Sequence, residues 1–152
     1  MTVTIRPGIA TDALELTRLI IALATYEKEP NAVEVTADIL ATQLNSPRPP
    51  FESFVADAGD GRLVGFALFF SSYSTWRGQS GLYLEDLFVE SSHRRRGVGR
   101  LLMDQLLTVG RQRGCKRLEW SVLDWNQLAI DFYRGLGAEP MTGWTTWRLN
   151  LG

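Results

Sequence analysis

The fold of this chain is decided by residues 82–99, which read LYLEDLFVESSHRRRGVG. Residues 81–89 are mainly apolar and predict a strand. A short polar loop follows, and Gly97 and Gly99 then lead into an amphipathic helix expected at about 98–113. A strand, a tight turn and a helix in this order form a crossover that returns the chain to a parallel neighbouring strand. This segment therefore predicts an α/β fold.

Hydrophobic periodicity and turn residues predict further elements on both sides of this segment. The expected strands are 3–6, 53–58, 63–71, 81–89, 117–122 and 146–151, and the expected helices are 12–26, 36–44, 98–113 and 126–136. The spacing of Asp12 and Glu15 is typical of a capping box at the start of the first helix. The helix after the turn has an apolar stripe of Val98, Leu101, Leu102, Leu106 and Val109. Early hairpins and a later crossover predict a mixed central sheet, antiparallel at first and flanked by about four helices.

The composition excludes several classes of protein. The 152 residues include 16 Lys and Arg against 17 Asp and Glu, so no overall charge attracts the chain to nucleic acid or an anionic membrane. No apolar run is long enough to span a bilayer and no signal-peptide pattern is present, which predicts a cytoplasmic protein. One cysteine and one histidine rule out an internal disulfide and argue against a metal site. We expect residues 1–152 to form a single domain.

The turn at residues 94–100 has the properties of an anion site. Unpaired N–H groups at the start of a helix point outward, and the helix dipole favours negative charge there. Gly97 and Gly99 let a ligand approach the backbone, and three consecutive arginines can pair with phosphate oxygens. A pyrophosphate fits these features, and a solvated basic turn is the alternative. Leu102 replaces the third glycine of a dinucleotide-binding turn, and the chain has no Gly-Lys-Ser or Gly-Lys-Thr of a Walker A loop.

The sequence R-x-x-G-x-G at residues 94–99, after a strand that ends in Phe88-Val89, resembles the coenzyme A motif of the GNAT superfamily. Asn126 and residues 130–138, IDFYRGLGA, resemble the motif that follows it. Within GNAT, the chain is most similar to the diamine (spermidine/spermine-type) N-acetyltransferases and their thialysine-acetylating relatives. The residues that carry this narrower similarity are Tyr26-Glu27, Gly65-Phe66-Ala67, Trp76, residues 83–89 and Trp125-Asn126.

The resemblance implies a GNAT-like acyl-CoA N-acyltransferase fold, in which two parallel central strands splay apart and hold the pantetheine arm of acetyl-CoA between them. It implies acetyl-CoA as cosubstrate, direct attack of an amine on the thioester, no metal, and a homodimer. The residues implied in binding the coenzyme are Leu87, Phe88, Val89, Arg94, Arg95, Arg96, Gly97, Val98, Gly99, Arg100, Asn126, Ala129 and Tyr133.

Acid and base chemistry needs its own residues, because an aliphatic amine with a pKa of about 10.4 must lose a proton before it attacks a thioester. Glu85 and Asp86 stand side by side in a mainly apolar strand, and strict alternation sends their side chains to opposite faces. We interpret Glu85 as the residue that receives the substrate ammonium and accepts its proton, with Asp86 as a further candidate. A structural ion pair at the strand end is the alternative.

Tyr133 falls on the apolar stripe Ala129, Phe132, Tyr133 and Leu136 of its helix, and spacing alone favours a core position. The resemblance implies instead that Tyr133 donates a proton to the departing coenzyme thiolate.

Acidic and aromatic side chains predict a cationic acceptor, because carboxylates and ring faces both attract ammonium groups. The candidate acceptor-binding residues are Tyr26, Glu27, Trp76, Glu85 and Asp86. Thr145-Thr146 precede Trp147-Arg148 where the diamine subgroup carries acidic residues, so a shorter diamine or lysine-like acceptor stays open beside a polyamine. We therefore predict an N-acetyltransferase that acts on a primary amine of a small cationic acceptor. A protein N-terminal or lysine acetyltransferase of the same fold and a non-catalytic CoA-binding module are the alternatives.

Overall fold

The computed structural model describes residues 2–152, which form one five-stranded sheet and four α-helices. The strands are β1 (Thr4–Pro7), β2 (Glu52–Asp57), β3 (Leu63–Ser74), β4 (Gln79–Val89) and β5 (Leu118–Glu119). The helices are α1 (Ala13–Tyr26), α2 (Ala37–Leu44), α3 (Val98–Gln112) and α4 (Gln127–Gly135), with short 3-10 turns η1 (Ala10–Asp12) and η2 (Ser91–His93). The chain divides into two compact units, one ending at Ser121 and one of Val122–Gly152, and only α4 among these elements belongs to the second.

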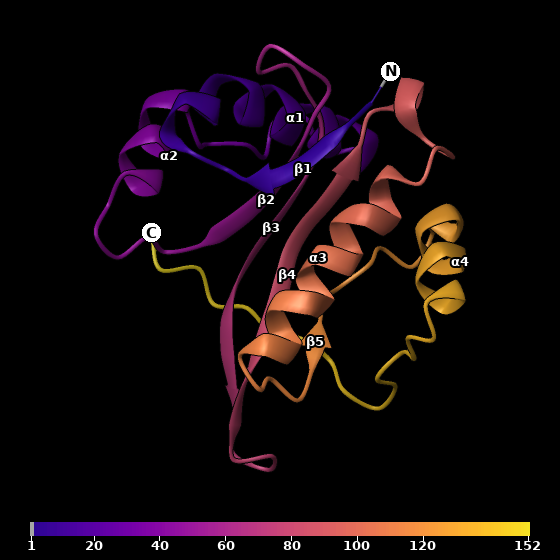
Figure 1. The fold of residues 1–152 in the computed structure, drawn as a ribbon. Helices are drawn as coiled ribbons and strands as arrows, with labels where there is room; N and C mark the ends of the chain where they lie inside the picture. The colour runs from indigo at the N-terminus through magenta and orange to yellow at the C-terminus, as the bar shows by residue number, and fades with distance from the viewer. Residues whose placement is uncertain (1) are drawn as a thin grey trace. The chain divides into compact units, whose positions relative to one another are not determined.

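The order of strands in the sheet follows their order in the sequence (Figure 1). Strands β1 to β4 are antiparallel neighbours, and β5 pairs with β4 in parallel after the crossover through α3. The turn between β2 and β3 has left-handed backbone at Gly59, Asp60 and Gly61, residue types that tolerate positive φ. The predicted mixed α/β sheet is confirmed.

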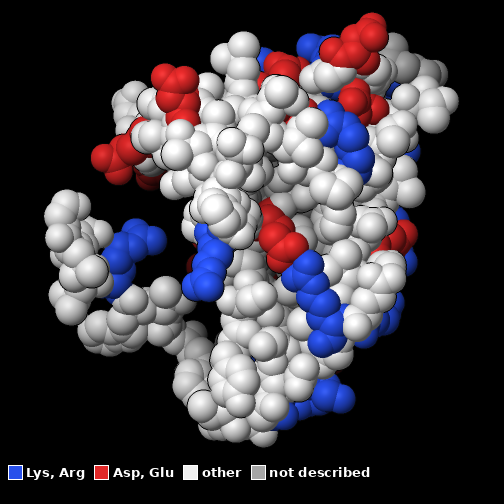
Figure 2. Space-filling model, turned by 60° about the vertical axis from the view of Figure 1, so that its left-hand side comes forward, with Lys and Arg blue, Asp and Glu red and all other residues white. Residues whose placement is uncertain are grey.

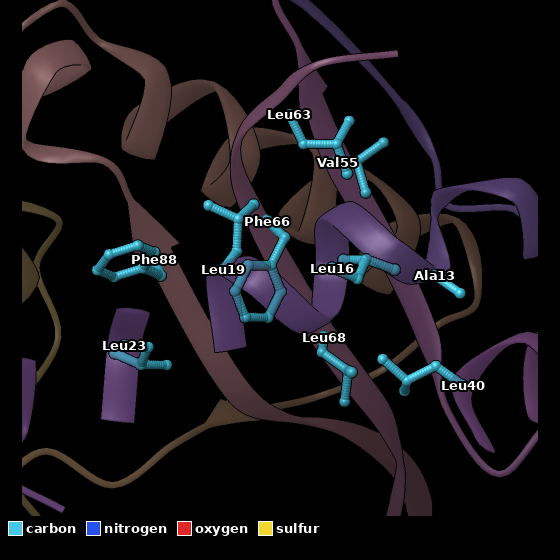
Figure 3. Close-up of a cluster of buried hydrophobic side chains, with 10 residues drawn as sticks. All are labelled: Ala13, Leu16, Leu19, Leu23, Leu40, Val55, Leu63, Phe66, Leu68 and Phe88. Carbon is cyan, nitrogen blue, oxygen red and sulfur yellow. The ribbon is translucent and has the colours of Figure 1, made fainter. Parts of the chain in front are cut away.

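The two faces of the sheet are covered by different helices. α1 and α2 cover one face, where apolar side chains pack against the sheet (Figure 3). The residues of this cluster are Ala13, Leu16, Leu19, Leu23, Leu40, Val55, Leu63, Phe66, Leu68 and Phe88. α3 covers the other face, where Leu102 and Leu106 are fully buried and a Cβ added to Gly110 would lie 3.4 Å from Cδ1 of Leu82.

The burial of α3 differs in one place from the predicted stripe. Leu101 is exposed, and Met103 is buried in its place. Successive residues of a helix are rotated by about 100°, so these two residues flank Leu102 on opposite sides. The spacing of apolar residues in the sequence allows either Leu101 or Met103 to be buried beside Leu102, and in the fold it is Met103 that packs against the sheet.

The capping box predicted for α1 is not formed. The Asp12 carboxylate accepts hydrogen bonds from the Ile9 N–H at 2.9 Å and from Nη1 of Arg6 at 2.8 Å. Glu15 accepts from the Leu63 N–H at 3.0 Å and pairs with Arg18. The two carboxylates therefore tie the start of α1 to β1 and β3, because distant partners in the fold replaced the local ones that the spacing indicated.

The strand predicted at residues 146–151 is absent from the described part of the chain, so this prediction was wrong. Alternation of Trp147, Leu149 and Leu151 indicated a strand, but no strand of residues 2–152 pairs with this segment, and Trp147 is 91% exposed. The strand predicted at 117–122 is also shorter, since β5 has only two residues. A strand exists only where a neighbour completes its hydrogen bonds, and alternation does not specify that neighbour.

No helix formed by residues 2–152 combines the length and apolar character needed to cross a membrane. On the face drawn in Figure 2, acidic and basic side chains are scattered among uncharged ones. This distribution agrees with the near balance of 16 basic and 17 acidic residues.

Candidate active site

Strand β4 has one fully paired edge and one edge that is mostly open. β3 pairs with β4 along its length from Gln79 to Val89, whereas β5 pairs only at Leu82 and Tyr83. Beyond Tyr83, no strand within residues 2–152 pairs with that side of β4. The parallel pair is therefore two residues long, and it leaves the edge of β4 open from Leu84 to Val89.

The peptide groups near the end of β4 alternate between these two edges. The N–H of Glu90 donates to the Val64 carbonyl of β3 at 2.8 Å, so Glu90 and Phe88 direct their peptide groups toward β3. Leu87 and Val89 alternate with these two residues along the strand, so they direct their peptide groups toward the open edge. An extended ligand that carries amide groups can add to such an edge as another strand would.

A β-bulge interrupts β4 at Glu85. Phe69 lies opposite Leu84 and Leu68 lies opposite Asp86, so Glu85 is an extra residue in the register with β3. Opposite residues share a face of the sheet, and Leu68 belongs to the cluster under α1. Asp86 therefore faces the side that α1 covers.

Glu85 faces the same side. Tyr83 lies opposite Phe70, which is two residues from Leu68 on β3, and Glu85 is two residues from Tyr83 on β4. The prediction that Glu85 and Asp86 face opposite sides was wrong, because it assumed unbroken alternation and the bulge inserts one residue.

Three carboxylates interact at this place. Burial, and then repulsion by the carboxylates of Glu85 and Glu27, raise the pKa of Asp86 to about 7. Burial also raises the pKa of Glu27, which caps the C-terminal end of α1. We call Glu27, Glu85 and Asp86 the acidic cluster. Because a carboxylate with a pKa near 7 can accept a proton at neutral pH, and a cation beside it would favour its charged form, the cluster suits an ammonium ligand.

The turn between β4 and α3 presents backbone donors. Arg95 has φ 64° and Gly97 has φ 79°, both in the left-handed region. Gly97 is the N-cap of α3 and has no side chain to accept a hydrogen bond, so the N–H groups of residues 98–100 have no partner inside the helix. A Cβ added to Gly97 would meet nothing within 4 Å, so the space beside this backbone is open. Successive N–H groups in such a turn form a concavity that binds anions.

The arginines of this turn divide into two groups. Arg95, Arg96 and Arg100 are exposed, and Nε of Arg100 pairs at 2.9 Å with the aspartate one helical turn further on. Arg94 is partly buried, and its Nε donates to the Val89 carbonyl at 3.0 Å. The exposed guanidinium groups can reach a phosphate bound at the turn, whereas that of Arg94 is engaged inside the protein.

The remaining predicted site residues lie in the second unit. Asn126 is buried, and its Oδ1 accepts a hydrogen bond from the Ala129 N–H at 3.2 Å, which caps α4. Tyr133 lies about one helical turn beyond Ala129 on α4 and is partly buried. Its ring meets that of Phe132 edge to face, with centroids 5.6 Å apart. Asn126 therefore fixes the start of the helix that carries Tyr133, in addition to any contact with a coenzyme.

Trp76 is not brought to the acidic cluster within one chain. It lies in the turn between β3 and β4 and is 81% exposed. Gln79, which follows this turn, is seven residues from Asp86 along β4, a distance of about 23 Å in an extended strand. Tyr26, by contrast, directly precedes Glu27 at the end of α1.

Two features of the site were missed in the sequence, the bulge and the anchoring of the end of β4. Glu90 forms ion pairs with Arg18 of α1 and, at 3.3 Å, with Arg62. These pairs join residues far apart in the chain and leave no local signal. The bulge does leave a weak signal in the sequence. Strict alternation would place Asp86 on the same face as Leu82, Leu84 and Phe88, and a charged residue among apolar ones on a strand face indicates that the alternation is broken.

Known proteins are similar to this chain over most of its length. Residues 16–138 match the Acetyltransferase (GNAT) family. The chain is 35% identical to the thialysine N-epsilon-acetyltransferase of Bos taurus, over 96% of this chain and 91% of that protein. It is 38% identical to the L-ornithine N5-acetyltransferase NATA1 of Arabidopsis thaliana, over 66% of this chain and 45% of that protein.

The fold also matches solved structures. The integron cassette protein VCH_CASS6 from the mobile metagenome of V. cholerae gives a TM-score of 0.80 at 27% identity, over 99% of this chain and 93% of that one. The sequence and the fold therefore agree. The chain belongs to the GNAT acetyltransferase family, whose members transfer an acetyl group from acetyl-CoA to an amine.

Proposed function

We propose that this chain transfers the acetyl group of acetyl-CoA to the primary amine of a small cationic acceptor, of the diamine, polyamine or lysine-like class. The observation that carries this proposal is the acidic cluster, which lies on the strand that leads into the anion-binding turn. A thioester bound along the end of β4 would be within a few residues of carboxylates that attract an ammonium group.

The coenzyme is proposed to bind in two parts. Its pantetheine arm would add to the open edge of β4, where Leu87 and Val89 direct their peptide groups. Its pyrophosphate would accept hydrogen bonds from the N–H groups of residues 98–100, with charge supplied by Arg95, Arg96 and Arg100. The stretch from Asn126 to Ala129, at the start of α4, would line the remainder of its path.

The acidic cluster is proposed to bind the acceptor and to take its proton. The ammonium group loses one proton to the Glu85–Asp86 pair, and the neutral nitrogen then attacks the carbonyl carbon of the thioester. A C–N bond forms, the C–S bond breaks, and the coenzyme leaves as a thiolate, while the acylated nitrogen releases its remaining extra proton to water and becomes a neutral amide. Burial and the neighbouring carboxylates raise the pKa of Asp86 to about 7, which suits this member of the pair to accept a proton at neutral pH.

Tyr133 is proposed to donate the proton that the thiolate takes. A phenol donates a proton readily to a thiolate formed beside it, and the product is then free coenzyme A. This assignment rests on the position of Tyr133 in the family motif, residues 130–138.

Two observations support a short acceptor. The relatives named above act, by their names, on thialysine and on L-ornithine, which are amino acids with an amine at the end of a short side chain. Thr145 and Thr146 are uncharged, so this part of the chain adds no carboxylate for the distant amines of a long polyamine. We further propose that residues 1–152 work as one domain, because the family match at 16–138 spans both compact units.

An acceptor screen tests the proposal. The chain is incubated with acetyl-CoA and each amine, and the released thiol is measured together with the mass of the acetylated product. The amines are thialysine, lysine, ornithine, 1,4-diaminobutane, spermidine, spermine, and peptides with a free N-terminus or an internal lysine. We expect turnover with thialysine, ornithine and the diamine, and lower kcat/KM with spermine.

Acetylation of peptides with no turnover of the small amines would make a protein acetyltransferase the better assignment. Binding of acetyl-CoA without turnover of any amine would favour a non-catalytic module.

A further inference from the structure

Arg94 is the first of three consecutive arginines, but its side chain is directed into the protein. Its Nε donates to the carbonyl of Val89, the last residue of β4, at 3.0 Å. Val89 is one of the residues whose peptide groups face the open edge of the strand. Arg94 therefore fixes an atom of the edge along which the coenzyme is proposed to lie.

The same guanidinium group also lies over two aromatic rings. Its central carbon is 4.9 Å from the centroid of the Tyr26 ring and 5.7 Å from that of Phe88. Tyr26 ends α1, and the next residue is Glu27 of the acidic cluster. A planar guanidinium can stack on aromatic faces while it donates hydrogen bonds in its own plane, which an ammonium group cannot do. One side chain thus joins the end of α1 to the end of β4.

We propose that Arg94 is a positioning residue that holds the acceptor-binding end of α1 in register with the coenzyme-binding edge of β4. This inference rests on the proposed function and deepens it. It gives the first arginine of the motif a task other than pairing with phosphate, which Arg95, Arg96 and the backbone of the turn can perform. The role follows from shape and stacking as well as charge, so lysine cannot replace Arg94.

Two thioesters separate this role from phosphate binding. Acetyl-CoA carries the pyrophosphate, whereas S-acetylpantetheine carries the same thioester and pantetheine arm without any phosphate. Arg94→Lys keeps the positive charge, so if Arg94 bound phosphate, that binding would be largely preserved in the variant. For a positioning residue, we expect Arg94→Lys to lower kcat/KM by about tenfold with both thioesters and to raise KM for the amine.

Two control variants accompany the measurement. Arg96→Gln removes an exposed charge of the turn, and we expect it to lower kcat/KM with acetyl-CoA only. Arg113 donates to both carboxylate oxygens of Glu52 at 2.7 and 2.6 Å, away from the turn, so Arg113→Lys disturbs a similar planar contact. We expect Arg113→Lys to leave kcat/KM with both thioesters within twofold of the unchanged chain.

The proposal is overturned if Arg94→Lys lowers kcat/KM with acetyl-CoA and not with S-acetylpantetheine, or if it changes neither by more than twofold. Circular dichroism shows whether Arg94→Lys folds. If it does not, the same two thioesters are compared in Tyr26→Leu, which removes one stacking ring and must lower both rates equally. If the wild-type chain is inactive on every amine, the proposed function itself is refuted. If the wild-type chain is active and Arg94→Lys is equally active, only the positioning role of Arg94 is refuted.

Discussion

Asp86 lies directly opposite Leu68 in the sheet, on the side that α1 covers. The bulge at Glu85 creates this relationship, because without the extra residue Asp86 would follow Leu84 onto the side of α3. The side that α1 covers also holds Glu27, and burial together with repulsion by Glu85 and Glu27 raises the pKa of Asp86 to about 7. One inserted residue thus gathers the acidic cluster.

The raised pKa of Asp86 predicts that this residue destabilises the fold at high pH. The unfolded chain releases the proton near pH 3.8 and the folded chain near pH 7, so the folded state binds more protons between these values. Its contribution to stability therefore falls as pH rises through this window and stays low above it. We expect Asp86→Asn to raise the free energy of unfolding by about 1–3 kcal/mol at pH 8, and to change it little at pH 4.

Urea unfolding at both pH values measures this difference. Asp60→Asn, an exposed aspartate in the turn between β2 and β3, is the matched control and should give no pH-dependent gain. Equal effects of Asp86→Asn at pH 4 and pH 8 would show that ionisation of the buried Asp86 carboxylate is not the cause.

Gly97 is expected to matter for coenzyme binding beyond its backbone conformation. Gly97 and Gly61 have φ 79° and 76°, and an added Cβ meets nothing within 4 Å at either position. Alanine at each should cost about 1 kcal/mol of stability through the same left-handed strain. Only Gly97→Ala places a methyl group beside the anion-binding turn, so it should weaken acetyl-CoA binding about tenfold in calorimetry. Similar dissociation constants for acetyl-CoA in Gly97→Ala and Gly61→Ala would show that the turn at Gly97 does not bind the coenzyme.

Tyr133→Phe tests the proposed proton donor. Loss of a general acid typically costs a factor of about 100 or more, so kcat should fall by about that factor. The ring and its packing against Phe132 remain, so α4 and the affinity for acetyl-CoA should be preserved. Steady-state kinetics and calorimetry on the same preparation measure both quantities. Unchanged turnover would remove Tyr133 from the mechanism.

The core under α1 should be the main source of stability for the acceptor end of the site. Leu19 is fully buried there, whereas Ile21 on the same helix is 45% exposed. Leu19→Ala should lower the free energy of unfolding by about 3 kcal/mol and Ile21→Ala by less than about 1 kcal/mol. Denaturant titration measures both, and equal losses would contradict the packing described here.

Much of the fold could be predicted from local patterns. Leu16, Leu19 and Leu23 recur at helical spacing, which is typical of a helix such as α1, and the glycine turn after β4 predicts the start of α3. These patterns depend on residues a few positions apart, which physical rules on helices and turns describe well. The strand predicted at 146–151 failed for the opposite reason, because its existence depends on a distant neighbour that spacing does not encode.

The candidate site was predictable in its residues more than in its geometry. The sequence predicts Glu27, Glu85 and Asp86 as site residues, but their grouping on one side depends on the bulge, which the pairing with β3 determines. Arg94 could be recognised as a member of the basic turn, whereas its stacking on Tyr26 depends on where α1 ends against β4. The charge and type of a side chain can be read from the sequence, whereas its contacts depend on how the strands pair and where α1 ends.

The central claim is that the acidic cluster selects a cationic acceptor, and the most direct test is the ratio of kcat/KM for 1,4-diaminobutane to that for 1-aminobutane. The two amines share a reacting group and a chain length, and only the diamine carries a second charge. Glu27, the member of the cluster that takes no proton in the proposed reaction, would bind this charge for about 1.5–3 kcal/mol, so the ratio should be about 10 to 160 and should fall to near 1 in Glu27→Gln. A ratio near 1 in the unchanged chain would contradict the account.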